Sequence, residues 1–189
     1  MTKRIRPCLC ALDDAVLRRR LAAIIQERGI MTVVETGIDW GGSTRFFAEM
    51  VSRVIGIDND PVRIAALEAE LMEDNASKGI YLIFGNSPDM LRELTLDAAH
   101  TLFFLDAHWQ AYWPLRDEIA AIPRGQGVLV MHDARVPGYP TLGFDTYNGQ
   151  ELSYEYLRDV LTEWSPSHRV EYNDDTAKGS RRGVMVVYP

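Results

Sequence analysis

Polar side chains stand at or just beyond the ends of short apolar runs along this 189-residue chain. They are Glu35, Asp58, Asn86, Ser87, Asp106, His132 and Asp133. Carboxylates accept hydrogen bonds from hydroxyl groups, and carboxylates and imidazoles together bind cations and move protons. Parallel strands place their carboxyl ends along one edge of a sheet, so these residues are predicted to form one site. Capping of the helices that follow is the alternative, and it suits one such residue better than all of them.

A glycine-bearing turn follows the first apolar run, 32–35. Gly37 and Gly41 lie in it, and a helix is expected to open near Ser43 with free N–H groups facing a ligand. About twenty residues further on, Asp58 ends the next run, where a carboxylate can accept both hydroxyls of a ribose. The spacing differs from the G-x-G-x-x-G pattern of dinucleotide-binding proteins. An ordinary strand–helix turn remains the alternative.

Helices and strands are predicted to alternate in the order needed to position these residues. The expected helices are 13–28, 44–53, 61–75, 88–94, 114–122 and 151–164, and the expected strands are 32–35, 54–57, 80–84, 101–105, 128–131, 169–172 and 183–188. This order predicts one α/β domain over 1–189, with a parallel sheet between two layers of helices and an N-terminal helix within 1–30. Segment 134–150 is rich in Gly, Pro and Tyr and is predicted to be an irregular lid or acceptor loop.

Composition narrows the functional classes. Twenty Lys and Arg against 27 Asp and Glu give a net charge of −7, which disfavours a broad grip on a nucleic-acid backbone. Cys8 and Cys10 are too close together for a metal knuckle and are expected to be reduced thiols. The sequence shows neither a signal-peptide pattern nor an apolar run of membrane-spanning length, so a cytoplasmic protein without membrane contact is expected.

Four segments together resemble one known family. The pattern Glu-x-Gly-x-x-x-Gly-Gly-Ser at 35–43 resembles motif I of the class I S-adenosylmethionine (SAM)-dependent methyltransferases. Segment 103–109, Phe-Phe-Leu-Asp-Ala-His-Trp, is similar to the Phe-Leu-Asp-His-Trp signature of catechol O-methyltransferase, with one residue inserted. Segments 85–89 and 133–138 resemble its turns after strands three and five. The resemblance spans about 33–138 and implies a Rossmann-like, mostly parallel seven-stranded sheet whose last strand is antiparallel.

The resemblance also implies how the cofactor SAM is held. Glu35, Gly37 and Ser43 would bind its methionine part, Asp58 its ribose, and Asn86 and Ser87 its adenine. Trp40 is a candidate to stack near the cofactor. The full set of implied cofactor-binding residues is Glu35, Gly37, Trp40, Gly41, Ser43, Asp58, Asn86, Ser87 and Asp106.

In the catechol enzymes, a divalent ion is held by two strand-end acids and an asparagine. Asp106 and Asp133 match the acids, whereas Ala134 stands at the asparagine position, so His132 is predicted as the third ligand. Oxygen ligands favour magnesium, and an imidazole shifts the preference toward manganese, iron or zinc. The ion would stabilise the alkoxide of the acceptor, with Asp106 and His108 as the catalytic pair and His108 as general base. Packing over the cofactor is the alternative role for His108.

The predicted function is transfer of a methyl group from SAM to a hydroxyl oxygen of a small molecule. One helix precedes the glycine turn where catechol-type enzymes carry more, so the acceptor pocket must differ or be completed by a partner subunit in a homo-oligomer. Two other classes compete. One is a SAM-fold binding or assembly protein without transferase activity. The other is a nucleotide-binding oxidoreductase, whose glycine spacing this chain lacks.

Overall fold

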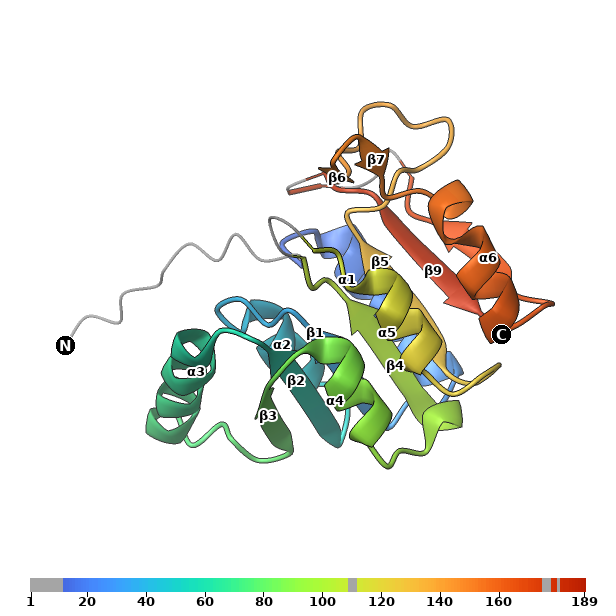
Figure 1. The fold of residues 1–189 in the computed structure, drawn as a ribbon. Coiled ribbons are helices and arrows are strands. Elements are labelled where there is room, and N and C mark those ends of the chain that lie inside the picture. Colours follow the sequence, from blue (N-terminus) through green and yellow to red (C-terminus); the bar gives the residue numbers. More distant parts are fainter. Residues whose placement is uncertain (1–11, 109–111, 175–177, 180) are drawn as a thin grey trace.

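A seven-stranded sheet forms the centre of the molecule, with strand order β3-β2-β1-β4-β5-β9-β8 (Figure 1). The computed structural model describes residues 12–108, 112–174, 178–179 and 181–189, so Cys8, Cys10 and Trp109 lie outside the described residues. The strands of this sheet are β1 Thr32–Thr36, β2 Arg53–Asp58, β3 Ile80–Phe84, β4 Thr101–Leu105, β5 Val128–His132, β8 Arg169–Tyr172 and β9 Val184–Tyr188.

Strands β1 to β5 are parallel, and β9 runs antiparallel between β5 and β8. This confirms the predicted mostly parallel sheet with an antiparallel last strand. The antiparallel position of β9 also separates this fold from the dinucleotide-binding sheet with strand order 3-2-1-4-5-6.

Helices cover both faces of the sheet. They are α1 Ala15–Glu27, α2 Gly42–Ala48, α3 Pro61–Glu73, α4 Ser87–Glu93, α5 Leu115–Ala121 and α6 Tyr154–Trp164, with a short 3-10 helix at Ala98–His100. Within β4, Leu102 and Phe104 pack in the core beneath α1 and α2, whereas Phe103 and Leu105 pack beneath α4, α5 and α6. Burial on both faces explains why the parallel strands appear in the sequence as continuous apolar runs.

Helix starts follow local capping rules. The Asp14 carboxylate accepts from the backbone N–H groups of Val16 and Leu17 at 2.7 and 3.2 Å, and Asp60 caps α3 with Pro61 in the first turn. The predicted helix 44–53 is too long, because α2 ends at Ala48 and Arg53 already pairs in β2.

Segment 134–150 is more ordered than the sequence predicts. A small hairpin, β6 Thr146–Tyr147 and β7 Gln150–Glu151, folds within and just beyond it. The predicted helix start at Glu151 is therefore wrong: that residue belongs to β7, and α6 begins at Tyr154 behind a Ser153 cap.

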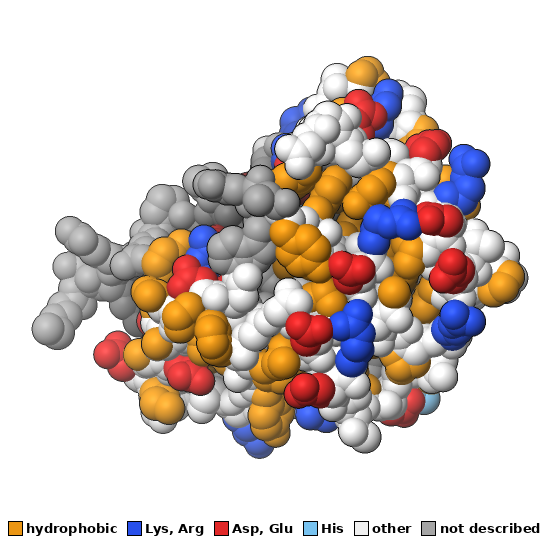
Figure 2. Space-filling view, viewed as in Figure 1, with side chains coloured by type: hydrophobic (Ala, Val, Ile, Leu, Met, Phe, Trp, Pro, Cys, Tyr) orange, Lys and Arg blue, Asp and Glu red, His pale blue; other side chains and the backbone are white. Residues whose placement is uncertain are grey.

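The face covered by α4, α5 and α6 carries side chains of both charges, interspersed in Figure 2. Arg116 on α5 pairs with Asp159 on α6 at 2.5 Å, and Arg92 pairs with Asp89 within α4 at 2.8 Å. Such mixed charge is typical of a solvated surface. Among the described residues, no helix combines the length and apolar character needed to cross a membrane.

The turn after β1 packs directly on the backbone of the turn after β4. Gly37 has a φ of 77°, and a Cβ there would lie 2.8 Å from the Asp106 carbonyl oxygen and 2.9 Å from the Ala107 Cα. The left-handed backbone and the close approach both require glycine. This contact brings Asp106 beside the glycine turn.

Gly37→Ala is expected to lower the free energy of unfolding by about 1–3 kcal/mol more than Gly138→Ala. Both glycines have a positive φ, 77° and 79°, so the cost of a left-handed alanine is shared, but nothing lies within 4 Å of a Cβ at Gly138. Urea unfolding of both variants measures the difference. Equal losses of unfolding free energy in the two variants would show that the turns after β1 and β4 can move apart without strain.

Candidate functional site

A cavity of about 460 Å³ opens at the carboxyl ends of the parallel strands, a volume that suits a small-molecule ligand. Most of the predicted site residues line it: Gly37, Ser43, Asp58, Asn86, Ser87, Asp106, His108, His132 and Asp133. They come from segments up to a hundred residues apart, roughly half the chain. The predicted convergence at one edge of the sheet is therefore present.

Glu35 does not line the cavity, contrary to the expectation that it contacts a ligand. It is fully buried below the glycine turn, where it accepts hydrogen bonds from the Ser43 hydroxyl and, at 2.6 Å, from the Thr44 hydroxyl. Burial raises the pKa of Glu35 to about 8, although both hydroxyl groups act to lower it. Glu35 thus holds the first turn of α2 and positions Ser43, which does face the cavity.

Trp40 and Gly41 also lie outside the cavity lining. Trp40 is 48% exposed, so the structure gives no support to the predicted stacking on a cofactor. A Cβ on Gly41 would lie 2.4 Å from a methyl group of Leu67, so this glycine allows α3 to pack against the turn.

Asp58 joins the turns after β1 and β2. One carboxylate oxygen accepts from the Ile38 N–H at 3.1 Å and the other from the Asp60 N–H at 2.8 Å. Burial raises the pKa of Asp58 above its usual value. Each carboxylate oxygen has two lone pairs, so both can still accept a hydroxyl hydrogen from the cavity.

The Ser87 hydroxyl donates to Glu118, a fully buried residue of α5 that the sequence analysis missed. Burial raises the pKa of Glu118 to about 7, and the bond from Ser87 lowers it. A signal was present in the sequence, because Glu118 occupies a core-facing position between Leu115 and Ile122 at helical spacing. Asn86, beside Ser87, donates to Asp89 at 2.8 Å.

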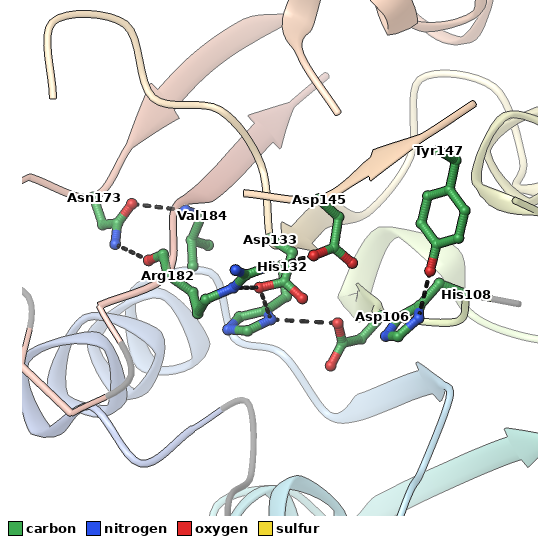
Figure 3. Close-up of polar contacts among 9 residues, drawn as sticks. All are labelled: Asp106, His108, His132, Asp133, Asp145, Tyr147, Asn173, Arg182 and Val184. Carbon is green, nitrogen blue, oxygen red and sulfur yellow. Dashed lines mark hydrogen bonds and ion pairs between the residues drawn. The ribbon is translucent and has the colours of Figure 1, made fainter. Parts of the chain in front are cut away.

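His132 lies between two carboxylates at the ends of β4 and β5 (Figure 3). Its Nδ1 is 3.3 Å from Asp106 Oδ1 and 3.1 Å from Asp133 Oδ1, and its side chain is 6% exposed. Burial lowers the pKa of His132, but Asp106 and Asp133 outweigh burial and raise it to about 10. The pKa of Asp133 falls to about 2, since His132 and Arg182 outweigh its burial. His132 is therefore a charged partner of both carboxylates.

Arg182, which no local sequence pattern revealed, completes this group. Its Nε donates to Asp133 and a terminal nitrogen donates to Asp145, as Figure 3 shows. Asp145 belongs to segment 134–150, and its N–H donates to the Asp133 carbonyl at 2.9 Å. The predicted lid segment is therefore tied to the end of β5.

His108 faces the cavity from the turn after β4, and its Nδ1 lies 2.8 Å from the Tyr147 hydroxyl of β6. Asp106, His108 and Asp133 each offer a donor atom within 4.8 Å of the others, and these donor types suit a divalent ion. The predicted ligand set changes, because His132 pairs with both acids and His108 is the imidazole in the group. Asp133 is not available to a metal ion in this arrangement, because its carboxylate is paired with Arg182.

No protein-family model and no curated protein sequence matches this chain. Solved structures do match its fold. An O-methyltransferase from Bacillus cereus in complex with S-adenosylhomocysteine aligns with a TM-score of 0.66 at 17% identity, covering 93% of this chain and 81% of that one. A Podospora anserina methyltransferase, PaMTH1, also bound to S-adenosylhomocysteine, gives 0.63 at 16% identity, covering 94% and 80%.

A third match has a different named activity. Precorrin 8W decarboxylase from Methanobacterium thermoautotrophicum aligns with a TM-score of 0.59 at 17% identity, covering 92% of this chain and 88% of that one. These matches establish the class I methyltransferase fold that the motifs predicted. Since one fold carries several activities, function has to be argued from the site.

Glu35→Gln is expected to change how stability depends on pH. The pKa of Glu35 is raised from 4.5 to about 8 on folding, so between these values the folded protein holds a proton that the unfolded chain has lost. Stability therefore falls as the pH rises from about 4.5 to 8, by at most about 1.4 kcal/mol per pH unit. Glutamine removes this contribution, so urea unfolding at several pH values should show the wild type losing stability relative to Glu35→Gln.

Glu68→Gln, an exposed change on α3, is the matched control and is expected to follow the wild-type pH dependence. A constant difference between wild type and Glu35→Gln across this pH range would contradict the raised pKa.

Proposed function

We propose that this protein is a SAM-dependent methyltransferase that methylates a hydroxyl oxygen of a small molecule. The observation that carries the proposal is the division of one cavity into two chemically different ends. Asp58, the glycine turn and Ser87 line it beside β2, β1 and β3, and Asp106, His108 and His132 line it beside β4 and β5, which follow β1 in the sheet. The fold shared with methyltransferases bound to S-adenosylhomocysteine supports the cofactor.

The cofactor would lie along the ends of β1 and β2. Asp58 would accept its ribose hydroxyls, the turn from Gly37 to Ser43 would hold its methionine part, and Asn86 and Ser87 would contact its adenine. Glu118 would act through Ser87 by fixing the direction of that hydroxyl. The nearby carboxylates Asp58 and Asp106 favour a positively charged sulfonium group.

The acceptor would lie at the end of β4, next to His108. When His108 carries its proton on Nδ1 and donates it to the Tyr147 oxygen, Nε2 has a free lone pair. That nitrogen would take the proton of the acceptor hydroxyl. At the same time the acceptor oxygen would attack the methyl carbon of SAM, and the bond between that carbon and the SAM sulfur would break. S-adenosylhomocysteine would be the second product. Because the displacement is in line, positioning by Tyr147 and Asp106 contributes to the rate.

Metal assistance, which the sequence predicted, is not part of the proposed reaction. Asp106, His108 and Asp133 would hold a divalent ion, and the ion would stabilise the alkoxide of the acceptor. The Arg182–Asp133 pair opposes binding in the present arrangement, so the steps described above do not rely on a metal.

A small acceptor is favoured over a macromolecule by the cavity and by the charge. Tyr147 and Asp145 bring the hairpin segment over the acceptor end, and the chain carries a net charge of −7. A binding or assembly protein without transferase activity would need the cofactor end only. A His108 imidazole beside Asp106 at the other end therefore favours the transferase.

Asp58→Asn is expected to weaken S-adenosylhomocysteine binding about 10- to 100-fold, because two hydroxyl groups lose a charged acceptor. Isothermal titration calorimetry measures the change, with Asp97→Asn as a control whose carboxylate pairs with His100 on the surface. Absence of SAM and S-adenosylhomocysteine binding by the wild type would remove the proposed function.

His108→Gln is expected to lower turnover about 10²- to 10⁴-fold, the range for losing a general base, with cofactor affinity unchanged. Release of S-adenosylhomocysteine from SAM is followed with a panel of phenols, diols and sugars. His100→Gln, an exposed histidine, is the control. Full activity of His108→Gln would assign His108 a packing role, and cofactor binding without turnover on any acceptor would support the binding protein.

A further inference from the structure

Arg182 is inserted among the carboxylates at the end of β5. Its guanidinium group binds Asp133 and Asp145 through different nitrogen atoms, which fixes both its position and its orientation. The side chain is 28% exposed, and those of Asp133 and Asp145 are 13% and 23% exposed. Ion pairs so well covered are screened less by solvent than those on an open surface.

The backbone on both sides of Arg182 is also fixed. The Asn173 amide donates to the Arg182 carbonyl at 2.8 Å, and its oxygen accepts from the Val184 N–H at 2.7 Å. The Gly183 N–H donates to the Gly143 carbonyl at 2.8 Å, and the Ala134 N–H donates to the Gly183 carbonyl at 2.9 Å. Arg182 is therefore part of a built arrangement joining β5, segment 134–150 and the start of β9.

The same carboxylates offer the ligand atoms for a cation. Asp106, His108 and Asp133 present donor atoms within 4.8 Å of one another, and Arg182 is bound to Asp133, one of the three. A divalent ion held there would lie close to the guanidinium group, and like charges so placed repel each other strongly. The ion and Arg182 therefore compete for Asp133.

We propose that Arg182 takes the place of a divalent metal at this site, so that the folded protein binds such ions weakly. The Arg182 guanidinium group then supplies the positive charge that a metal ion would supply next to these carboxylates. Removal of the guanidinium charge leaves Asp133 paired with His132. The site then offers two carboxylates and the His108 imidazole without the arginine. This inference concerns metal affinity alone and does not depend on the proposed methyl transfer.

The test is direct binding of Mn²⁺ to the whole protein, measured by calorimetry and by the electron paramagnetic resonance signal of free Mn²⁺. Arg182→Gln is expected to bind Mn²⁺ at least about 10-fold more tightly than the wild type, because the guanidinium repulsion is removed and Asp133 keeps only its contact with His132 among the described cationic side chains. Arg181→Gln is the matched control: this neighbouring arginine contacts the Thr141 hydroxyl instead and should leave affinity unchanged.

Two further variants locate the effect. Adding Asp133→Asn to Arg182→Gln is expected to abolish the gain in Mn²⁺ affinity. Arg182→Lys keeps one positive charge but cannot span both carboxylates, so its gain in Mn²⁺ affinity should be smaller. This variant replaces Arg182→Gln in the test if Arg182→Gln does not fold. Thermal unfolding checks the fold of each. Wild-type affinity equal to that of the folded Arg182 variants, or a gain that survives Asp133→Asn, would overturn the proposal.

Discussion

Two partly buried carboxylates meeting at one buried imidazole determine the arrangement of this site. Strands β4 and β5 are neighbours in parallel register, with Leu105 opposite Met131, so the residues that follow them must come together. Asp106 and Asp133 would repel each other there, and His132 between them offsets that repulsion. Asp133 also pairs with Arg182, which in turn pairs with Asp145 of the loop segment.

Most of the fold, and the convergence of strand-end side chains at one cavity, could be predicted from the sequence because their signals are local. Apolar runs, helical spacing and caps such as Asp14 and Asp60 depend on residues close in the chain. The position of Asp58 follows from the end of a strand and the rules of a parallel sheet. Local signals do not specify which way a side chain faces, and so they did not reveal that Glu35 bonds to Ser43 and Thr44 beneath the turn.

The acceptor end could not be predicted in the same way. Arg182 reaches Asp133 across 49 residues of sequence and Asp145 across 37, and both contacts depend on how the β8–β9 hairpin returns to the sheet. The β6–β7 hairpin was missed because strands of two residues leave no periodic signal. Glu118 is an intermediate case, since its helical spacing revealed a core position but not its partner Ser87.

The two ends of the cavity therefore differ in how far the fold alone determines their shape. Backbone turns and close glycine packing shape the proposed cofactor end. Side-chain ion pairs between the loop segment, β5 and the start of β9 shape the acceptor end, and they change with single residues. Structural likeness at 16–17% identity thus shows the fold alone, whereas in the function proposed above the choice of acceptor would depend on Arg182, Asp145 and Tyr147.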